Sequence, residues 1–184
     1  MKRTLGLLLA AVTATTVVTV LGGAAPAAAA TPPDGTYMLV NDKSARCLDQ
    51  DYSDNTQHRH VLAWPCNVGS LNQRWRKVQV TGDWFHLVNV RSGKCLNQDY
   101  SNNTEHSNVI AYTCDAGSFL NDVWYSYYDT GKGKWAIGNL ESNKCLDQDY
   151  SGGTMHTNIL AYKCQPNSQL QTTISNQLWW FDSI

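Results

Sequence analysis

Acidic, amide and aromatic side chains recur at fixed positions around three pairs of cysteines in this 184-residue chain. An acid or an amide stands two residues after the first cysteine of each pair, and an aromatic residue stands two residues before the second. One or two amides follow, just before a tryptophan. Carboxylates accept charge-assisted hydrogen bonds, amides donate and accept, and aromatic rings stack on C–H groups. Each set therefore suits a ligand with a rim of hydroxyl groups and an apolar face.

The middle set differs from the other two. The members are Asp49, Trp64, Asn72 and Gln73 in the first set, Asn97, Tyr112, Asn121 and Asp122 in the second, and Asp147, Tyr162, Asn176 and Gln177 in the third. In the second set acid and amide have traded places. Either this site has lost affinity or its carboxylate approaches from the other side. The first interpretation is favoured, because losing a charged acceptor weakens a key bond; Asn97→Asp with Asp122→Gln should then add a site.

The six cysteines fit a threefold internal repeat. An even number of cysteines in an exported chain indicates disulfides, and six allow 15 connectivities. Each pair is separated by 19 residues, and the starting cysteines lie 48 and 50 residues apart. The repeat favours three local bridges, because each copy then carries the same one: Cys47 to Cys66, Cys95 to Cys114, and Cys145 to Cys164.

The elements that position these residues are predicted to be β-strands. Segments rich in aromatic and β-branched residues, or alternating in polarity, occur at 36–41, 60–64, 84–89, 108–112, 134–139 and 158–162. Gly, Asn, Asp and Ser fill the gaps between them, as turns require. We expect four short strands in each of three repeats, at about 35–82, 83–131 and 132–183. Repeats of this kind bury a shared core, in which we place Trp75, Trp124 and Trp179.

The first thirty residues predict a secretory signal peptide. Lys2 and Arg3 precede an apolar run at 4–21, and Ala28-Ala29-Ala30 offers a cleavage site before Thr31. A membrane anchor is less favoured, because small residues rather than charges follow the run, and no other segment would span a bilayer. The expected single domain, 31–184, has 154 residues. Without Lys2 and Arg3 it has 12 basic and 15 acidic residues, a net charge of −3, which does not suit nucleic acid.

The motifs C-L-D, an aromatic before the second cysteine, and N-Q-x-W together resemble the ricin B-type lectin repeat over about 35–183. The resemblance implies an all-β β-trefoil and a secreted protein that binds glycans through two or three shallow sites. It carries the binding role to the first and third sets, with the Asn touching sugar and the Gln supporting from behind, and makes the middle set degenerate. Many members carry Gln two residues before the aromatic, where this chain has Leu62, Ile110 and Leu160, so the usual galactose preference does not carry over.

A secreted protein-binding β-trefoil, such as a protease inhibitor, is the alternative. Its unique loop would be 165–176, an insertion of about six residues that would equally enlarge the third sugar site. Threefold copies of every acid argue against catalysis, since catalytic sets are normally single. Neither metal nor cofactor is expected, and a protein partner stays open. His58, His106 and His156 are assigned to turns, and Asp51, Asp99 and Asp149 are expected to order the turn in which each lies.

Overall fold

The computed structural model describes residues 31–101, 105–115, 119–165 and 174–184. Within these ranges the chain is all-β, with short 3-10 segments between the strands. The predicted four strands per repeat are confirmed. The first repeat contains β1 (Gly35–Asn41), β2 (Cys47–Gln50), β3 (Val61–Trp64) and β4 (Arg74–Thr81). The second contains β5 (Trp84–Asn89), β6 (Cys95–Gln98), β7 (Val109–Tyr112) and β8 (Trp124–Asp129). The third contains β9 (Lys134–Asn139), β10 (Cys145–Gln148), β11 (Ile159–Tyr162) and β12 (Leu178–Ser183).

Four described 3-10 segments link the strands: η1 (Ser53–Asn55), η2 (Leu71–Gln73), η4 (Ser151–Gly153) and η5 (Ser175–Gln177). Each is three residues long, which is too short to leave a helical period in the sequence. η1 and η4 lie in equivalent turns of the first and third repeats, and η2 and η5 immediately precede β4 and β12. η2 and η5 therefore fold the amides of the first and third sets against the strands that carry the acid.

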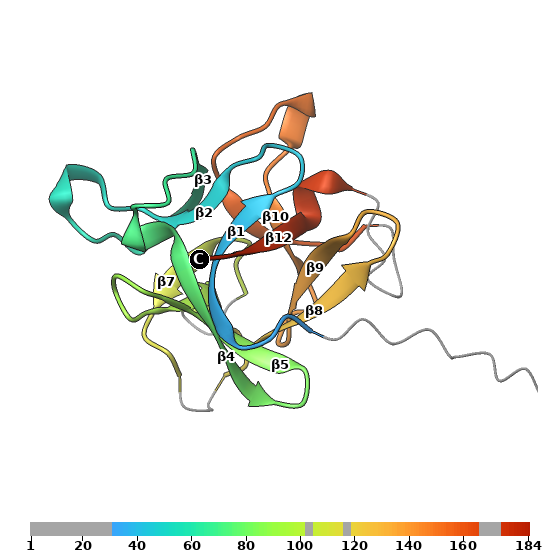
Figure 1. The fold of residues 1–184 in the computed structure, drawn as a ribbon, viewed down its shortest axis with the longest axis horizontal. Coiled ribbons are helices and arrows are strands. Elements are labelled where there is room, and N and C mark those ends of the chain that lie inside the picture. Colours follow the sequence, from blue (N-terminus) through green and yellow to red (C-terminus); the bar gives the residue numbers. More distant parts are fainter. Residues whose placement is uncertain (1–30, 102–104, 116–118, 166–173) are drawn as a thin grey trace, which may run out of the picture.

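Six of the strands form a closed barrel. Antiparallel pairs run β1–β4, β4–β5, β5–β8, β8–β9, β9–β12 and β12–β1, so the last strand closes on the first. The remaining strands form three hairpins, β2–β3, β6–β7 and β10–β11. In Figure 1 the β4–β5 hairpin lies at the bottom, while β2, β3 and β10 lie at the top around β1 and β12. A six-stranded barrel with three hairpins is the predicted β-trefoil.

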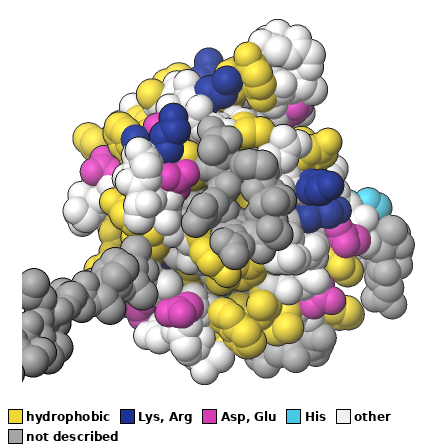
Figure 2. Space-filling view, turned by 90° about the vertical axis from the view of Figure 1, so that its right-hand side faces the viewer, with side chains coloured by type: hydrophobic (Ala, Val, Ile, Leu, Met, Phe, Trp, Pro, Cys, Tyr) yellow, Lys and Arg dark blue, Asp and Glu magenta, His cyan; other side chains and the backbone are white. Residues whose placement is uncertain are grey.

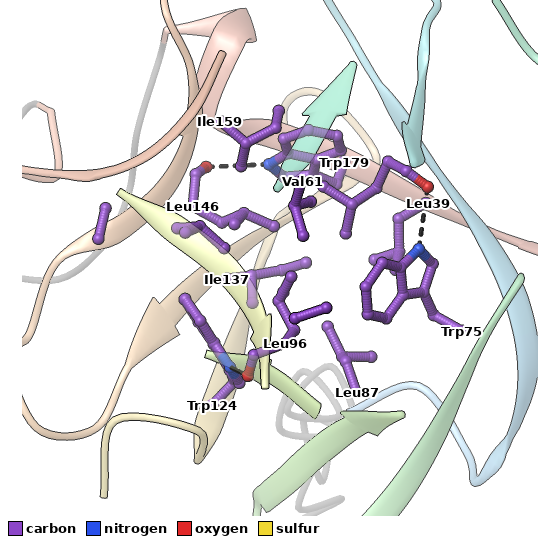
Figure 3. Packing of buried hydrophobic residues seen from close by; sticks show 14 of the residues in the cluster. Leu39, Val61, Trp75, Leu87, Leu96, Trp124, Ile137, Leu146, Ile159 and Trp179 are labelled. Atoms are coloured by element: carbon purple, nitrogen blue, oxygen red, sulfur yellow. Dashed lines mark hydrogen bonds between the residues drawn. The ribbon is translucent and has the colours of Figure 1, made fainter. Parts of the chain in front are cut away.

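The three repeat tryptophans lie at the centre, as predicted. Trp75, Trp124 and Trp179 are all fully buried. Each indole Nε1 donates to a backbone carbonyl 2.9 Å away, and the acceptors are Leu48, Leu96 and Leu146. Figure 3 shows the three rings around a shared cluster of aliphatic side chains. A buried indole needs a partner for its N–H, and here each repeat supplies the same one from the strand that carries its acid or amide.

The predicted disulfides are all present: Cys47–Cys66, Cys95–Cys114 and Cys145–Cys164. Each joins the start of one hairpin strand to the residues just after the other. The hairpin register also pairs the first cysteine with the aromatic, as Cys47 opposite Trp64 in the first repeat. The bridge therefore fixes the base of the hairpin directly beneath the aromatic ring.

The hairpins contact one another around the threefold axis. The backbone N–H of Ala63 donates to Thr157, that of Ala111 to Arg59, and that of Ala161 to Ser107, each over 2.7 Å. The three acceptors occupy equivalent positions in the three repeats. Each hairpin is thus bordered by the turn of a different repeat.

Candidate functional site

Three surface hollows lie beside the three hairpins, one for each repeat. Their volumes are about 280 Å³ in the first repeat, 510 Å³ in the second and 460 Å³ in the third. We call them the first, middle and third hollows. The lining shared by all three consists of the acid or amide after the first cysteine, the Asp-Tyr-Ser turn, the apolar residue, the aromatic and the Asn. In the first hollow these are Asp49, Asp51, Tyr52, Ser53, Leu62, Trp64 and Asn72.

The base of the first hollow is a carboxylate held by two amides. Asn72 Nδ2 donates to Asp49 Oδ1, and Gln73 Nε2 donates to Asp49 Oδ2, both over 2.6 Å. Asn72 Nδ2 also donates to the Gln50 carbonyl over 3.2 Å, and Ser70 Oγ donates to Asn72 Oδ1. Asp49 is 4% exposed, and each of its oxygens retains a lone pair. It can therefore accept a hydrogen bond from a ligand without moving.

The third hollow repeats this arrangement. Asp147 Oδ1 accepts from Asn176 Nδ2 over 3.0 Å, and Oδ2 accepts from Gln177 Nε2 over 2.6 Å. Burial raises the pKa of Asp147 to about 6, against the two amide hydrogen bonds that lower it. Burial likewise raises the pKa of Asp49. Asn176 Oδ1 is buried and has no hydrogen-bond partner among the described residues, so the third hollow holds one more unused acceptor than the first.

Each hollow has an exposed aromatic ring on one wall. Trp64, Tyr112 and Tyr162 are 53%, 47% and 52% exposed. Leu62, Ile110 and Leu160 line the same hollows, because alternate residues of a strand share a face. An aromatic ring beside a carboxylate acceptor presents a stacking face and a polar base within one small concave surface.

The structure places the predicted binding residues of the first and third sets together. Asp49, Trp64 and Asn72 line the first hollow, and Gln73, which is 1% exposed, lies behind Asp49. The third hollow contains Asp147, Tyr162, Asn176 and Gln177. The asparagine donors point inward to the carboxylate and backbone rather than outward. Within the protein, each asparagine therefore holds the carboxylate in place, as each glutamine does.

The middle hollow has lost its base carboxylate. Asn97 and Asn121 line it together with Tyr112, and Asn121 Nδ2 donates to Asn97 Oδ1 over 2.5 Å. Asp122 is fully buried and does not line the hollow. Its Oδ2 accepts from the backbone N–H of Asp115 over 2.8 Å, the bond that the glutamine oxygens make in the other repeats. The carboxylate of Asp122 therefore lies behind the wall of the middle hollow rather than at its base.

A histidine faces this buried carboxylate. His86 Nδ1 lies 3.4 Å from Asp122 Oδ2, while Asp122 Oδ1 is buried and has no hydrogen-bond partner among the described residues. The equivalent positions hold Met38 in the first repeat and Ala136 in the third, where the position of Asp122 is an uncharged glutamine. The middle repeat thus differs at three coupled positions, and His86 accompanies the acid.

Replacing His86 by methionine, the residue of the first repeat, is expected to lower the free energy of unfolding by about 1–3 kcal/mol, since a buried carboxylate loses a partner. The same change in an Asp122→Gln background should be nearly neutral, because the glutamine carries no charge. Urea unfolding of the wild type, the two single variants and the double variant checks the coupling. Additive losses would contradict the pairing.

The Asp-Tyr-Ser turns occupy a position at the hollows that the sequence did not reveal. The prediction that Asp51, Asp99 and Asp149 order their turns is confirmed, because each accepts from the backbone N–H of the serine two residues on. They also line the hollows, as do the tyrosines that follow them. The signal was their threefold recurrence beside the predicted ligand residues, which fits a binding role as well as a scaffold role.

Cross-repeat contacts hold these tyrosines. The guanidinium of Arg91 lies 3.4 Å from the ring centroid of Tyr52, and Lys43 Nζ lies 3.8 Å from that of Tyr150. The middle repeat has Tyr100, and the third repeat supplies Glu141 at the equivalent position. Burial, followed by the charges of Glu105 and Glu141, raises the pKa of Tyr100. The first and third turns are therefore held by cations, whereas the middle turn lies beside Glu141 and beside Glu105, which is paired with Lys144.

The insertion predicted at 165–176 is described only at its ends, since 166–173 lie outside the described residues. Gln165 and Ile174 both line the third hollow. Both described ends of the insertion therefore lie at this hollow.

The possible metal sites offer little. His156 Nε2 lies 3.3 Å from the Ser151 carbonyl, in keeping with a turn role. In the described part of the chain, the ligand atoms of His86, Cys95 and Asp122 all lie within 4.8 Å of one another. The sulfur of Cys95 is in a disulfide, so this group has no thiolate to offer a metal ion.

Two further observations concern nucleic acid and membranes as partners. Figure 2 shows basic and acidic side chains close together on one face of the molecule. Among the described residues no helix is long and apolar enough to cross a membrane.

Solved structures with similar folds include a designed threefold symmetric protein, ThreeFoil, which is 27% identical with a TM-score of 0.66 and covers 82% of this chain and 100% of its own. The exo-β-1,3-galactanase 1,3Gal43A from Clostridium thermocellum is 28% identical with a TM-score of 0.62; the match covers 84% of this chain but 31% of the galactanase. A ricin B-like lectin from Macrolepiota procera, solved with lactose, is 21% identical with a TM-score of 0.61 over 84% of this chain and 99% of its own.

No curated protein sequence matched the chain. The ricin-type β-trefoil lectin domain-like family matches residues 24–112 and 71–162, well over half of the sequence. The barrel, the three hairpins and the three buried tryptophans agree with that assignment. The chain therefore belongs to the ricin-type β-trefoil lectin domain-like family.

Proposed function

We propose that this protein is a secreted lectin that binds glycans in the first and third hollows. The observation that carries the proposal is the base carboxylate of each hollow, held by two amides beside a half-exposed aromatic ring. Asp49 and Asp147 would accept from adjacent sugar hydroxyls, while Trp64 and Tyr162 stack on the C–H face of the ring. The family and its lectin relatives support carbohydrate binding.

Each hollow is shallow, so we expect single sugars to bind weakly. Two hollows held rigidly on one domain can raise the avidity for a polymer by about 10²–10⁴, provided that one chain reaches both. Polymeric or branched glycans should therefore bind far better than the free sugar. No catalytic step is proposed, because the turn acids recur in threefold copies, whereas catalytic sets are normally single.

Secretion is part of the proposal. Three disulfides are consistent with an extracellular location, and the predicted signal peptide, with cleavage after Ala30, would deliver the domain there. The predicted signal peptide lies outside the described residues. Mass spectrometry of the protein recovered from the medium of expressing cells would give the mature N-terminus.

A glycan array with the folded domain tests the function. The expected result is a set of neutral glycans that bind wild type and lose signal in the double variant Asp49→Ala and Asp147→Ala. Arg76→Ser is a matched surface control, because Arg76 is exposed on β4 and lines none of the three hollows. An array without hits on protein that melts cooperatively would overturn the proposal.

Binding at the third hollow is expected to weaken as the pH falls. The pKa of Asp147 is about 6, so at pH 5 only about one tenth of this carboxyl remains ionised, and affinity there should drop roughly tenfold from pH 7.5. The folded-state pKa lies above the ordinary value of 3.8, so this group stabilises the fold as the pH falls from 6 toward 4. Weaker binding at pH 5 without a lower melting temperature, and its absence in Asp147→Asn, would confirm the effect; a flat pH profile would contradict it.

A further inference from the structure

The middle hollow has a cation in its lining. Among the described residues, the first and third hollows are each lined by two carboxylates and no cation. The middle hollow is lined by Arg59, Asp99 and Asp115. Compared with the other two hollows, the middle hollow lacks the base acid and has a guanidinium in addition, and each of these differences adds one positive unit of charge. Asp115 is an additional carboxylate and removes one of these two units. Counted over the lining residues alone, its net charge is therefore −1, against −2 in each neighbour.

The position of Arg59 is set by the fold. Its carbonyl accepts from the N–H of Ala111 over 2.7 Å, the contact that Ser107 and Thr157 make in the other two interfaces. Over the rings next to those smaller side chains, Trp64 and Tyr162, no cation lies among the described residues. Arg59 instead places its guanidinium 4.5 Å from the ring centroid of Tyr112. The first repeat thus delivers a fixed cation beside the stacking ring of the second.

The base of the middle hollow offers a donor instead of an acceptor. Asn97 Oδ1 is taken by Asn121 Nδ2. Within the described part of the chain Asn97 Nδ2 makes no hydrogen bond, and Asn97 lines the hollow. The carboxylate of Asp122 is buried behind the wall. In the middle hollow Asn97 stands in place of an acid, and Arg59 stands in place of Ser or Thr. Both replacements add hydrogen-bond donors.

An additional aromatic residue enlarges the apolar wall. Ten positions separate Cys114 from Trp124, against nine from Cys66 to Trp75. Counted back from the asparagine, Phe119 stands where the first repeat has Ser70. Phe119 is 44% exposed and lines the hollow. The middle hollow therefore has three aromatic residues in its lining, Tyr100, Tyr112 and Phe119, against two in each of the others, and the largest volume of the three.

We infer that the middle hollow binds an acidic saccharide, a sugar whose ring carries a carboxylate. The carboxylate would be held by the guanidinium of Arg59, which suits a planar carboxylate in bidentate geometry, and by Asn97 Nδ2. The ring would stack on Tyr112, and its hydroxyls would donate to Asp99 and Asp115. This inference rests on the proposed function, in that the ligand is a saccharide, but it assigns to the middle hollow a different sugar class from that of its neighbours.

The test is calorimetry with trisaccharides that contain one glucuronic, galacturonic or sialic acid, each beside its uncharged methyl ester. At least one acid should bind about tenfold more tightly than its ester, and the affinity should fall with added salt. Arg59→Ser, which copies Ser107, should remove this preference and leave binding of neutral glycans unchanged. Arg76→Ser, the same change of charge on the barrel, should alter neither.

Replacing two residues of the middle repeat by those of the first supplies a second test. Asn97→Asp with Asp122→Gln restores the pair of the first repeat and should turn the middle hollow from acidic to neutral saccharides. If neutral glycans bind but every acidic trisaccharide binds with the same affinity as its methyl ester, this inference alone is overturned. An acid preference that survives Arg59→Ser would also overturn it. Failure of all saccharides, neutral and acidic, would overturn the proposed function as well.

Discussion

Trp179→Ala is expected to lower the free energy of unfolding by about 3–5 kcal/mol, the usual cost of removing a large buried aromatic side chain. Trp179 is fully buried in the shared cluster, and its indole N–H donates to the Leu146 carbonyl over 2.9 Å. Alanine would leave both a cavity and a buried carbonyl without its donor. By the threefold repeat, Trp75→Ala and Trp124→Ala should behave alike.

The next residue is the control. Trp180 follows Trp179 on β12 but points to the other side of the strand and is 47% exposed. Its ring contacts Lys134 Nζ, 4.3 Å from the centroid, so Trp180→Ala should cost about 1 kcal/mol or less. Guanidinium unfolding of both variants measures the difference. Equal losses in the two would contradict a core centred on the repeat tryptophans.

The sequence was sufficient for the scaffold because repetition and strand periodicity are local signals. The spacing of Cys47, Trp64 and Cys66 recurs in every repeat, and a tryptophan follows each second cysteine. The structure confirms the bridge, the exposed ring and the buried ring. Alternation along one strand was enough to place Leu62 on the same wall as Trp64. Three copies of a unit that cannot bury its own apolar face indicated a shared core, while the β-trefoil was implied by the resemblance to the ricin B-type lectin repeat.

What the sequence could not predict depends on contacts between repeats. Arg59 lies in the turn of the first repeat but lines the middle hollow, and no spacing within a repeat tells which turn borders which hairpin. The inward orientation of the Asn72 and Asn176 donors depends on side-chain rotamers around a buried carboxylate. The traded acid and amide were visible, but burial alone decides that Asp122 lies behind the wall.

The largest expected effect on function follows from Asp147→Asn and Asp49→Asn. A charge-assisted hydrogen bond contributes about 1.5–3 kcal/mol, so each change should weaken neutral glycan binding at its own hollow by about 10- to 100-fold. Asparagine has one acceptor oxygen where the carboxylate has two. In the third hollow Asn176 and Gln177 both donate to Asp147, so the new NH₂ group would face a donor.

The middle repeat suggests how to separate the effect of losing the carboxylate charge from the effect of placing an NH₂ group against a donor. There Asn97 is accompanied by Asp122 and His86, so Asp147→Asn combined with Gln177→Asp and Ala136→His reproduces a set that the fold already accommodates. Both the single and the triple variant should lose the third site, but the triple variant should keep more of the wild-type melting temperature. In calorimetry with a neutral trisaccharide, the stoichiometry should fall from two to one for either aspartate change and to zero for both. A stoichiometry that stays at two in Asp49→Asn or Asp147→Asn, on protein that melts normally, would show that neither base carboxylate holds the sugar.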